Sequence, residues 1–260
     1  MIQPGARLAD VRLRTVTGVL LAAVAFAAVW IGGLVFAALI AVAAALVLGE
    51  WRGLTRLKLW AYRAALAFLA AGLALAIVDV RLEGLLMAAA LIGAGSLLLL
   101  PFAGPPAFGL AYAGLPAVAL IWLRALPWGL EIIVWVLAVV IATDVFAYIA
   151  GRSIGGRKLA PAISPAKTWA GLFGGVAAAL VVGWLTAHYF ALPGWLGLSG
   201  GLMAVLAQIG DLFESWLKRR AGAKDSGNLL PGHGGVMDRV DGFMPVALAT
   251  AAAVVVGMGL

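Results

Sequence analysis

The chain has 260 residues, of which 65% are hydrophobic and 11% charged, and its mean hydropathy is +1.10. Apolar runs close to the ~20 residues that cross a bilayer exclude a soluble core and predict an all-α, polytopic integral membrane protein. The net charge of +7 does not indicate a nucleic-acid binder, because the cations flank apolar runs instead of forming a basic surface studded with aromatic residues. The absence of cysteine excludes disulfides and thiolate metal sites, which leaves oxygen ligands for any metal.

About nine transmembrane helices are predicted, at about residues 15–30, 32–49, 61–80, 85–103, 106–126, 129–150, 168–190, 194–217 and 242–260. Only Gly32 and Gly33 separate the first two runs, so a re-entrant hairpin is the alternative there. The N-terminus also resembles a secretory signal, but a second apolar run follows at once.

The basic residues predict the orientation of these spans. With nine spans, all but Arg81 and Arg124 of the 18 lysines and arginines fall on one side of the membrane. The positive-inside rule makes that side cytoplasmic, with the N-terminus inside and the C-terminus outside. We expect a bacterial inner (plasma) membrane protein, with anionic lipid or an anionic substrate as its partner and no nucleic acid.

The two halves of the chain differ in their polar residues. Residues 1–130 read as N-terminal membrane-scaffold helices, in which Glu50 and Trp51 are interpreted as interfacial anchors. Residues 131–260 gather polar residues at the cytoplasmic ends of their spans, and we expect the functional site and its loops there.

Span six carries an acidic residue inside its apolar run. Asp144, Ala147, Tyr148 and Gly151 share one helical face, and a lone intramembrane carboxylate either pairs with a cation or holds a metal. The turn that follows contains Gly155 and Gly156 among basic residues that can neutralise phosphates.

Span seven begins after a Ser-Pro segment. Ser164-Pro165 favours an extended entry, and Thr168 is predicted to cap the helix, whose amides then point into the cytoplasmic cleft. Lys167 beside such a helix end suits a phosphate. The alternative is an ordinary interfacial lysine next to a capping threonine.

Span eight ends with Asp211, Glu214, Ser215 and Lys218 on one face. Glu214 and Lys218 are spaced for an i,i+4 ion pair. Asp211 lies deeper in the membrane and has no evident partner in the sequence.

The loop after span eight is the most densely charged part of the chain, with Lys224-Asp225-Ser226, then Pro231-Gly232-His233-Gly234-Gly235, then Asp238-Arg239-x-Asp241. Glycines around His233 let backbone amides approach an anion, and Asp238 with Asp241 can present hard oxygen ligands to Mg²⁺. Carboxylates interleaved with cations suit a metal–polyphosphate complex, and a solvated charged loop is the alternative.

These segments together resemble the signature of the phosphatidate cytidylyltransferases, also called CDP-diacylglycerol synthases. The resemblance covers roughly residues 140–245 and is carried by Asp144-x-x-Ala-Tyr148, Ser164-Pro-x-Lys167-Thr-Trp, Gly210-Asp211-Leu-Phe-Glu214-Ser, Ser215-x-x-Lys218-Arg219 and the charged loop. Ala170 departs from it, because the family commonly has glutamate or glutamine after the tryptophan.

The resemblance implies a reaction of CTP with phosphatidic acid in a catalytic cavity that faces the cytoplasm, and it implies a homodimer. It leads us to expect one or two Mg²⁺ ions, with Asp211 and Asp238 first among the ligands and Asp144, Asp225 and Asp241 next. The expected catalytic residues are Asp211, Lys224, Asp225, His233, Asp238, Arg239 and Asp241. The expected substrate-binding residues are Ser164, Lys167, Thr168, Ser215, Lys218, Arg219, Ser226, Gly234 and Gly235.

Two rival functions remain open at this point. A related CTP-dependent enzyme acting on another lipid phosphate would carry similar loops. An anion transporter would use the basic loops as a phosphate gate, but it predicts inverted repeats and charges at the bilayer midplane, and the sequence has neither.

Overall fold

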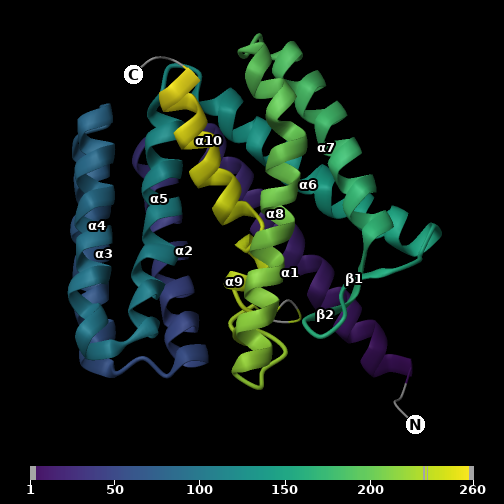
Figure 1. Cartoon of the computed structure of the whole chain (residues 1–260), viewed down its shortest axis with the longest axis horizontal. Helices are drawn as coiled ribbons and strands as arrows, with labels where there is room; N and C mark the ends of the chain where they lie inside the picture. Colours follow the sequence, from purple (N-terminus) through teal and green to yellow (C-terminus); the bar gives the residue numbers. More distant parts are fainter. Residues whose placement is uncertain (1–3, 231, 233, 258–260) are drawn as a thin grey trace.

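The computed structural model describes residues 4–230, 232 and 234–257, with side chains from Thr15 onward, and Figure 1 shows a bundle of long helices. The helices and strands in chain order are α1 (Pro4–Ile31), α2 (Gly33–Thr55), α3 (Leu59–Val78), α4 (Leu82–Ala103), the 3₁₀ helix η1 (Pro105–Phe108), α5 (Gly109–Ala125), α6 (Gly129–Ser153), β1 (Lys158–Ala160), β2 (Ser164–Thr168), α7 (Trp169–Tyr189), α8 (Gly194–Arg220), α9 (Met237–Val240) and α10 (Phe243–Gly257).

Seven helical segments among the described residues are long and apolar enough to cross a bilayer, and Thr15–Ile31 and Phe243–Gly257 are shorter apolar helices. This confirms the prediction of an all-α polytopic membrane protein, with one addition. The short strands β1 and β2 pair antiparallel, with Ala160 opposite Ser164 and Lys158 opposite Thr168. The count of nine spans stays a prediction.

The helix α5 forms the centre of the bundle. In its apolar segment 72% of the residues are buried, against 28% to 39% in the other long spans. Its neighbours include α2, α3, α4 and α10, which cover it on several sides. Helices of the first half of the chain are therefore packed against the last helix.

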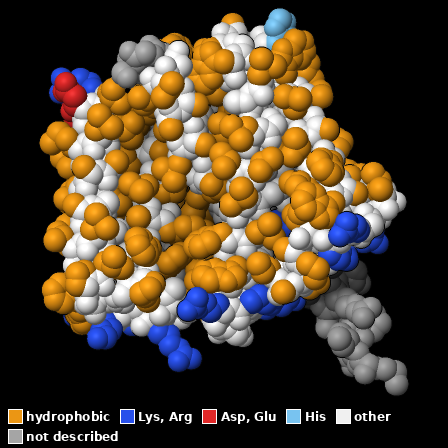
Figure 2. All heavy atoms as spheres, viewed as in Figure 1, with side chains coloured by type: hydrophobic (Ala, Val, Ile, Leu, Met, Phe, Trp, Pro, Cys, Tyr) orange, Lys and Arg blue, Asp and Glu red, His pale blue; other side chains and the backbone are white. Residues whose placement is uncertain are grey.

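The lysines and arginines gather at one end of the bundle. Figure 2 shows them mainly along the lower edge, and Figure 1 places the α2–α3 and α8–α9 connections and the start of α1 at that end. The one-sided charge distribution read from the sequence is thus present in the fold. That this end faces the cytoplasm stays a prediction.

Glycines let α6, α7 and α8 approach closely. A Cβ on Gly171 or Gly175 would lie 2.8 Å from the carbonyl oxygens of Ala147 and Thr143 on α6, and one on Gly200 would lie 2.5 Å from that of Ala179. Such close backbone contacts are typical of helix interfaces in membranes. They bring the polar ends of the three helices next to one another.

Candidate active site

Lys167 belongs to β2, in the connection between α6 and α7, and its side chain contacts α8. Lys167 Nζ lies 2.7 Å from Asp211 Oδ2 and donates to Gln208 Oε1 at 2.9 Å, and Ser215 Oγ lies 3.3 Å from Asp211 Oδ1. Asp211, which has no evident partner in the sequence, thus has Lys167 as its partner in the fold. The partner comes from another element, which helical spacing within α8 cannot reveal.

Thr168 caps α7 as predicted. Its extended backbone ends β2, and its buried Oγ1 accepts a hydrogen bond from the amide of Gly171 at 3.0 Å. The Ser164-Pro165 segment is extended, as expected, because it forms the start of β2. Gly155 and Gly156 adopt positive φ angles of 68° and 92°, which allow the tight basic turn before β1.

Lys218 joins two buried carboxylates. Its Nζ lies 2.7 Å from Glu214 Oε2, which confirms the predicted i,i+4 ion pair, and 2.6 Å from Asp238 Oδ1. The side chains of Glu214 and Asp238 are only 1% and 5% exposed, and that of Lys218 is 12% exposed. Two buried carboxyl groups therefore share one cation here.

Both oxygens of Asp238 are occupied by donors of the protein. Oδ2 lies 2.8 to 2.9 Å from the amides of Ser226 and Gly235 and from the Ser226 hydroxyl. Burial opposes the ionisation of Asp238, but hydrogen bonds, led by that from Lys218, outweigh burial and lower its pKa to about 2. The amide of Gly235, expected to face a bound anion, donates to Asp238 instead. Position 234 requires glycine for two reasons. Its φ is 82°, and a Cβ at this position would lie 2.8 Å from Asp238 Oδ2.

Glu50 belongs to the same network, contrary to its interpretation as an interfacial anchor. Its Oε1 accepts from the amide of Val236 at 2.7 Å, and its Oε2 accepts from the amide of Met237 and the hydroxyl of Ser226 at 2.8 Å. The sequence did carry a signal, because Glu50 is an acid near the end of an apolar run, as Asp144 is.

Trp51 is also not an interfacial anchor. It is 5% exposed, its Nε1 donates to the carbonyl oxygen of Pro106 at 2.9 Å, and its ring lies 5.0 Å from that of Tyr112. Trp51 therefore fixes the end of α2 against η1 and α5, next to Glu50.

A second group of acids comprises Asp144 of α6, Asp211 of α8 and Asp241, which follows α9. Burial and the negative charges of Asp211 and Asp144 raise the pKa of Asp241 to about 6, although the amide of Gly242 donates to Asp241 Oδ1 at 2.8 Å. In the described part of the chain no three such side chains converge closely enough to form a ready metal site. Carboxylate oxygens are the hard donors that Mg²⁺ takes, but in this arrangement the described acids alone do not form such a site.

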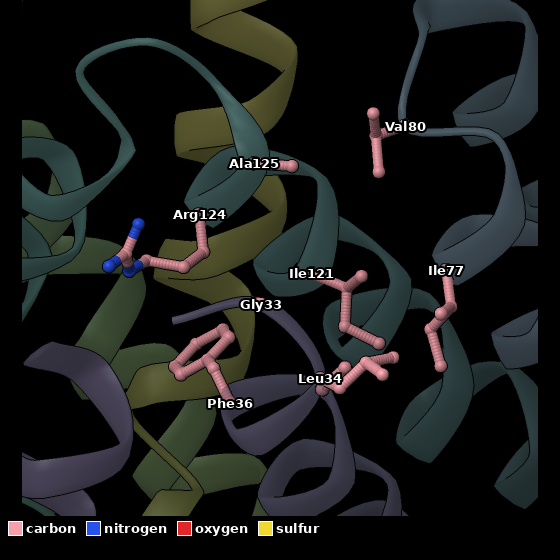
Figure 3. A pocket seen from close by; sticks show the side chains of 9 residues that line it. Gly33, Leu34, Phe36, Ile77, Val80, Ile121, Arg124 and Ala125 are labelled. Carbon is pink, nitrogen blue, oxygen red and sulfur yellow. The ribbon is translucent and has the colours of Figure 1, made fainter. Parts of the chain in front are cut away.

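The cavity drawn in Figure 3 lies away from these residues. It has a volume of about 220 Å³ and is lined by apolar side chains such as Leu34, Ile77 and Ile121. Arg124 extends away from them and donates to the carbonyl oxygens of Val29 and Trp30 at the end of α1. Gly33, which also lines the cavity, lies roughly 25 Å from Glu50 along the axis of α2.

Residues 12–256 match the cytidylyltransferase family. The chain belongs to this family. It is 42% identical over 251 residues to the phosphatidate cytidylyltransferase of Brucella abortus biovar 1 (strain 9-941), and the match covers 92% of each chain. Proteins of the same name from Haemophilus influenzae and Bacillus subtilis are 43% and 46% identical over 120 residues, which cover 44% and 45% of this chain. The family resemblance read from the motifs is confirmed.

Several expected site residues of this cytidylyltransferase family member are exposed or contact other parts of the chain. Lys224, Asp225 and Arg239 have exposed side chains. Arg219 donates to the carbonyl oxygens of Ile163 and Ala223 at 3.5 and 3.4 Å. It therefore links α8 to the turn between β1 and β2. His233 and Pro231 lie outside the described residues. Ala170 occupies the first turn of α7, directly after Thr168 and Trp169.

Proposed function

We propose that this chain transfers the cytidylyl group of CTP to phosphatidic acid, giving CDP-diacylglycerol and pyrophosphate. The observation that carries the proposal is the charged network of the loop and of Lys167 and Asp211, found in a chain that is 42% identical to a named phosphatidate cytidylyltransferase over 92% of its length. The membrane-spanning fold supports a substrate that is itself a lipid.

The chemistry needs charge neutralisation more than proton transfer. An oxygen of the lipid phosphate attacks the α-phosphorus of CTP, the bond from that phosphorus to the bridging oxygen breaks, and pyrophosphate leaves. A phosphate monoester is already largely ionised at neutral pH, so no general base is required. Positioning and electrostatic stabilisation supply the catalysis, as in other phosphoryl-type transfers.

Mg²⁺ is proposed as the cofactor. When bound, it would screen the triphosphate and stabilise the charge of the departing pyrophosphate. Asp211, Asp144 and Asp241 are the proposed ligands whose charges lie near one another. Asp238 remains a proposed ligand, but its oxygens are held by Lys218 and by loop donors, so it would have to exchange partners first.

The cations are proposed to hold the phosphates. Lys167 lies beside Asp211 and the start of α7, where it would contact the triphosphate once a metal neutralises Asp211. The exposed Lys224 and Arg239 would reach the lipid phosphate or the triphosphate, as would Arg219. Ser226, Ser215 and His233 are proposed to orient phosphate oxygens.

The test uses purified protein in detergent with phosphatidic acid, radiolabelled CTP and Mg²⁺, with and without EDTA. We expect label in a chloroform-soluble product only when the metal is present. CTP binding without labelled lipid would indicate another lipid phosphate as acceptor, and no CTP binding would overturn the proposal. We also propose that the chain forms a homodimer, which crosslinking in the native membrane tests. The proposed location is a bacterial inner membrane, with the basic end of the bundle in the cytoplasm.

A further inference from the structure

Glu50 connects the first half of the chain to the charged loop. It is half-buried at the end of α2 and accepts three hydrogen bonds of 2.7 to 2.8 Å, from two amides at the start of α9 and from the Ser226 hydroxyl. These contacts join residues that lie 176 to 187 positions apart in the sequence. Hydrogen bonds to a charged acceptor are stronger than those between neutral groups.

The loop backbone is shaped around this carboxylate. A Cβ on Gly227 would lie 3.0 Å from Glu50 Oε1, and one on Gly235 would lie 2.5 Å from Glu50 Oε2. Only glycine leaves room for the carboxylate at Gly235, because the Ser226 hydroxyl also crowds that position. A residue that served only as an interfacial anchor would not need such a close fit.

Ser226 links Glu50 directly to Asp238. Its hydroxyl oxygen lies 2.8 Å from Glu50 Oε2 and 2.9 Å from Asp238 Oδ2, so one hydroxyl bridges the two carboxylates. Glu50 also holds the amides of Val236 and Met237, the residues just before Asp238. Glu50 therefore fixes Asp238 through both the hydroxyl and the backbone.

We propose that Glu50 is a positioning residue for the cytidylyl transfer, and this inference rests on the proposed function. It fixes Ser226 and the start of α9, so that Ser226 and Asp238 keep the geometry that the phosphates require. In this arrangement both carboxylate oxygens of Glu50 are already taken up by donors of the protein. Its loss should therefore lower the rate of the chemical step more than the binding of CTP or lipid.

The first test compares Glu50→Gln with the wild-type protein. The amide has nearly the same shape, but its NH₂ group would face a backbone N–H or the Ser226 hydroxyl. We expect kcat to fall roughly 10- to 100-fold, with KM for CTP and for phosphatidic acid changed less than threefold. Glu83→Gln is the matched control, because Glu83 is a 75% exposed acid in the first turn of α4. That control should keep wild-type kinetics.

Hydrogen exchange provides a readout that needs no turnover. In the substrate-free protein, the amides of residues 226 and 235–238 should exchange at least tenfold faster in Glu50→Gln than in the wild type. Glu50→Asp keeps the charge on a shorter side chain and should give intermediate exchange and kcat. If Glu50→Gln does not yield folded protein, the exchange and kcat of Glu50→Asp test the positioning role instead.

Two results would overturn the inference: a Glu50→Gln kcat within twofold of wild type, or unchanged exchange across residues 226–238. Failure of the proposed function looks different. In that case the wild-type protein makes no labelled lipid, while the exchange data still show whether Glu50 orders the loop.

Discussion

The ammonium of Lys167, from β2, and the carboxylate of Asp211, from α8, lie 2.7 Å apart at the basic end of the bundle. Lys167 is thus the counter-ion of an acid that we propose as a metal ligand. In the protein without substrate, the lysine and the proposed metal would compete for the same carboxylate.

This competition predicts opposite effects for Lys167→Met. Removing the ammonium should strengthen Mn²⁺ binding to the substrate-free protein roughly tenfold, because a nearby positive charge is lost. It should also lower turnover at least 100-fold, because the triphosphate loses a cation. Electron paramagnetic resonance of free Mn²⁺ measures the first effect. The exposed Lys58 provides the control Lys58→Met, and weaker Mn²⁺ binding in Lys167→Met would contradict the competition.

Lys218→Met should be among the most destabilising substitutions in the loop region. It leaves Glu214 and Asp238 buried without their shared cation, and breaking such a pair costs about 3–5 kcal/mol. Denaturant or thermal unfolding in detergent measures the loss. Arg220→Met, which removes an exposed cation from the same helix, should change stability little. Adding Glu214→Gln to Lys218→Met should recover part of the loss.

The pH dependence of stability should change in Asp241→Asn. The pKa of Asp241 is raised from 3.8 to about 6, so ionised Asp241 opposes folding by up to about 3 kcal/mol. This penalty is complete above about pH 6 and shrinks as pH falls from 6 toward 4. In EDTA, Asp241→Asn should therefore melt above the wild type at pH 7.5, and the difference should narrow at pH 5. A difference that widens toward pH 5 would show that the sign is wrong.

Gly210→Ala should separate α8 from the segment that carries Asp241. The new Cβ would overlap the carbonyl oxygen of Asp241 and lie 2.8 Å from Pro245 Cγ. Overpacking of this kind costs about 1–3 kcal/mol, and here it should also reduce turnover because Asp241 moves relative to Asp211. Gly201→Ala on the same helix is the control, since its nearest neighbour, Val176 Cγ1, lies at an ordinary 3.6 Å. Equal effects of the two substitutions would argue against this packing role.

Local patterns predicted the features that depend on neighbours in the sequence. The threonine cap at Thr168 and the ion pair between Glu214 and Lys218 follow from helix geometry over three or four residues. The apolar runs predicted the membrane helices, because burial in lipid requires length and composition more than any particular contact.

Contacts between distant segments could not be predicted in this way. The partners of Asp211 and Glu50 come from β2 and from the charged loop, and only the packing of whole helices decides which polar ends meet. The roles of Gly171 and Gly175 were missed for the same reason, since a glycine shows its purpose only when the opposing backbone is known.

The face of α6 around Asp144 is open in the structure. Asp144 is exposed, as are Ile141 and Tyr148, one turn before and one turn after it. An acidic group thus borders an exposed apolar surface of a membrane-spanning helix. For an enzyme with a lipid substrate, this arrangement would allow in-plane diffusion to deliver the reactant and remove the product without extraction from the bilayer. The rate would then follow the mole fraction of substrate in the membrane and not its bulk concentration.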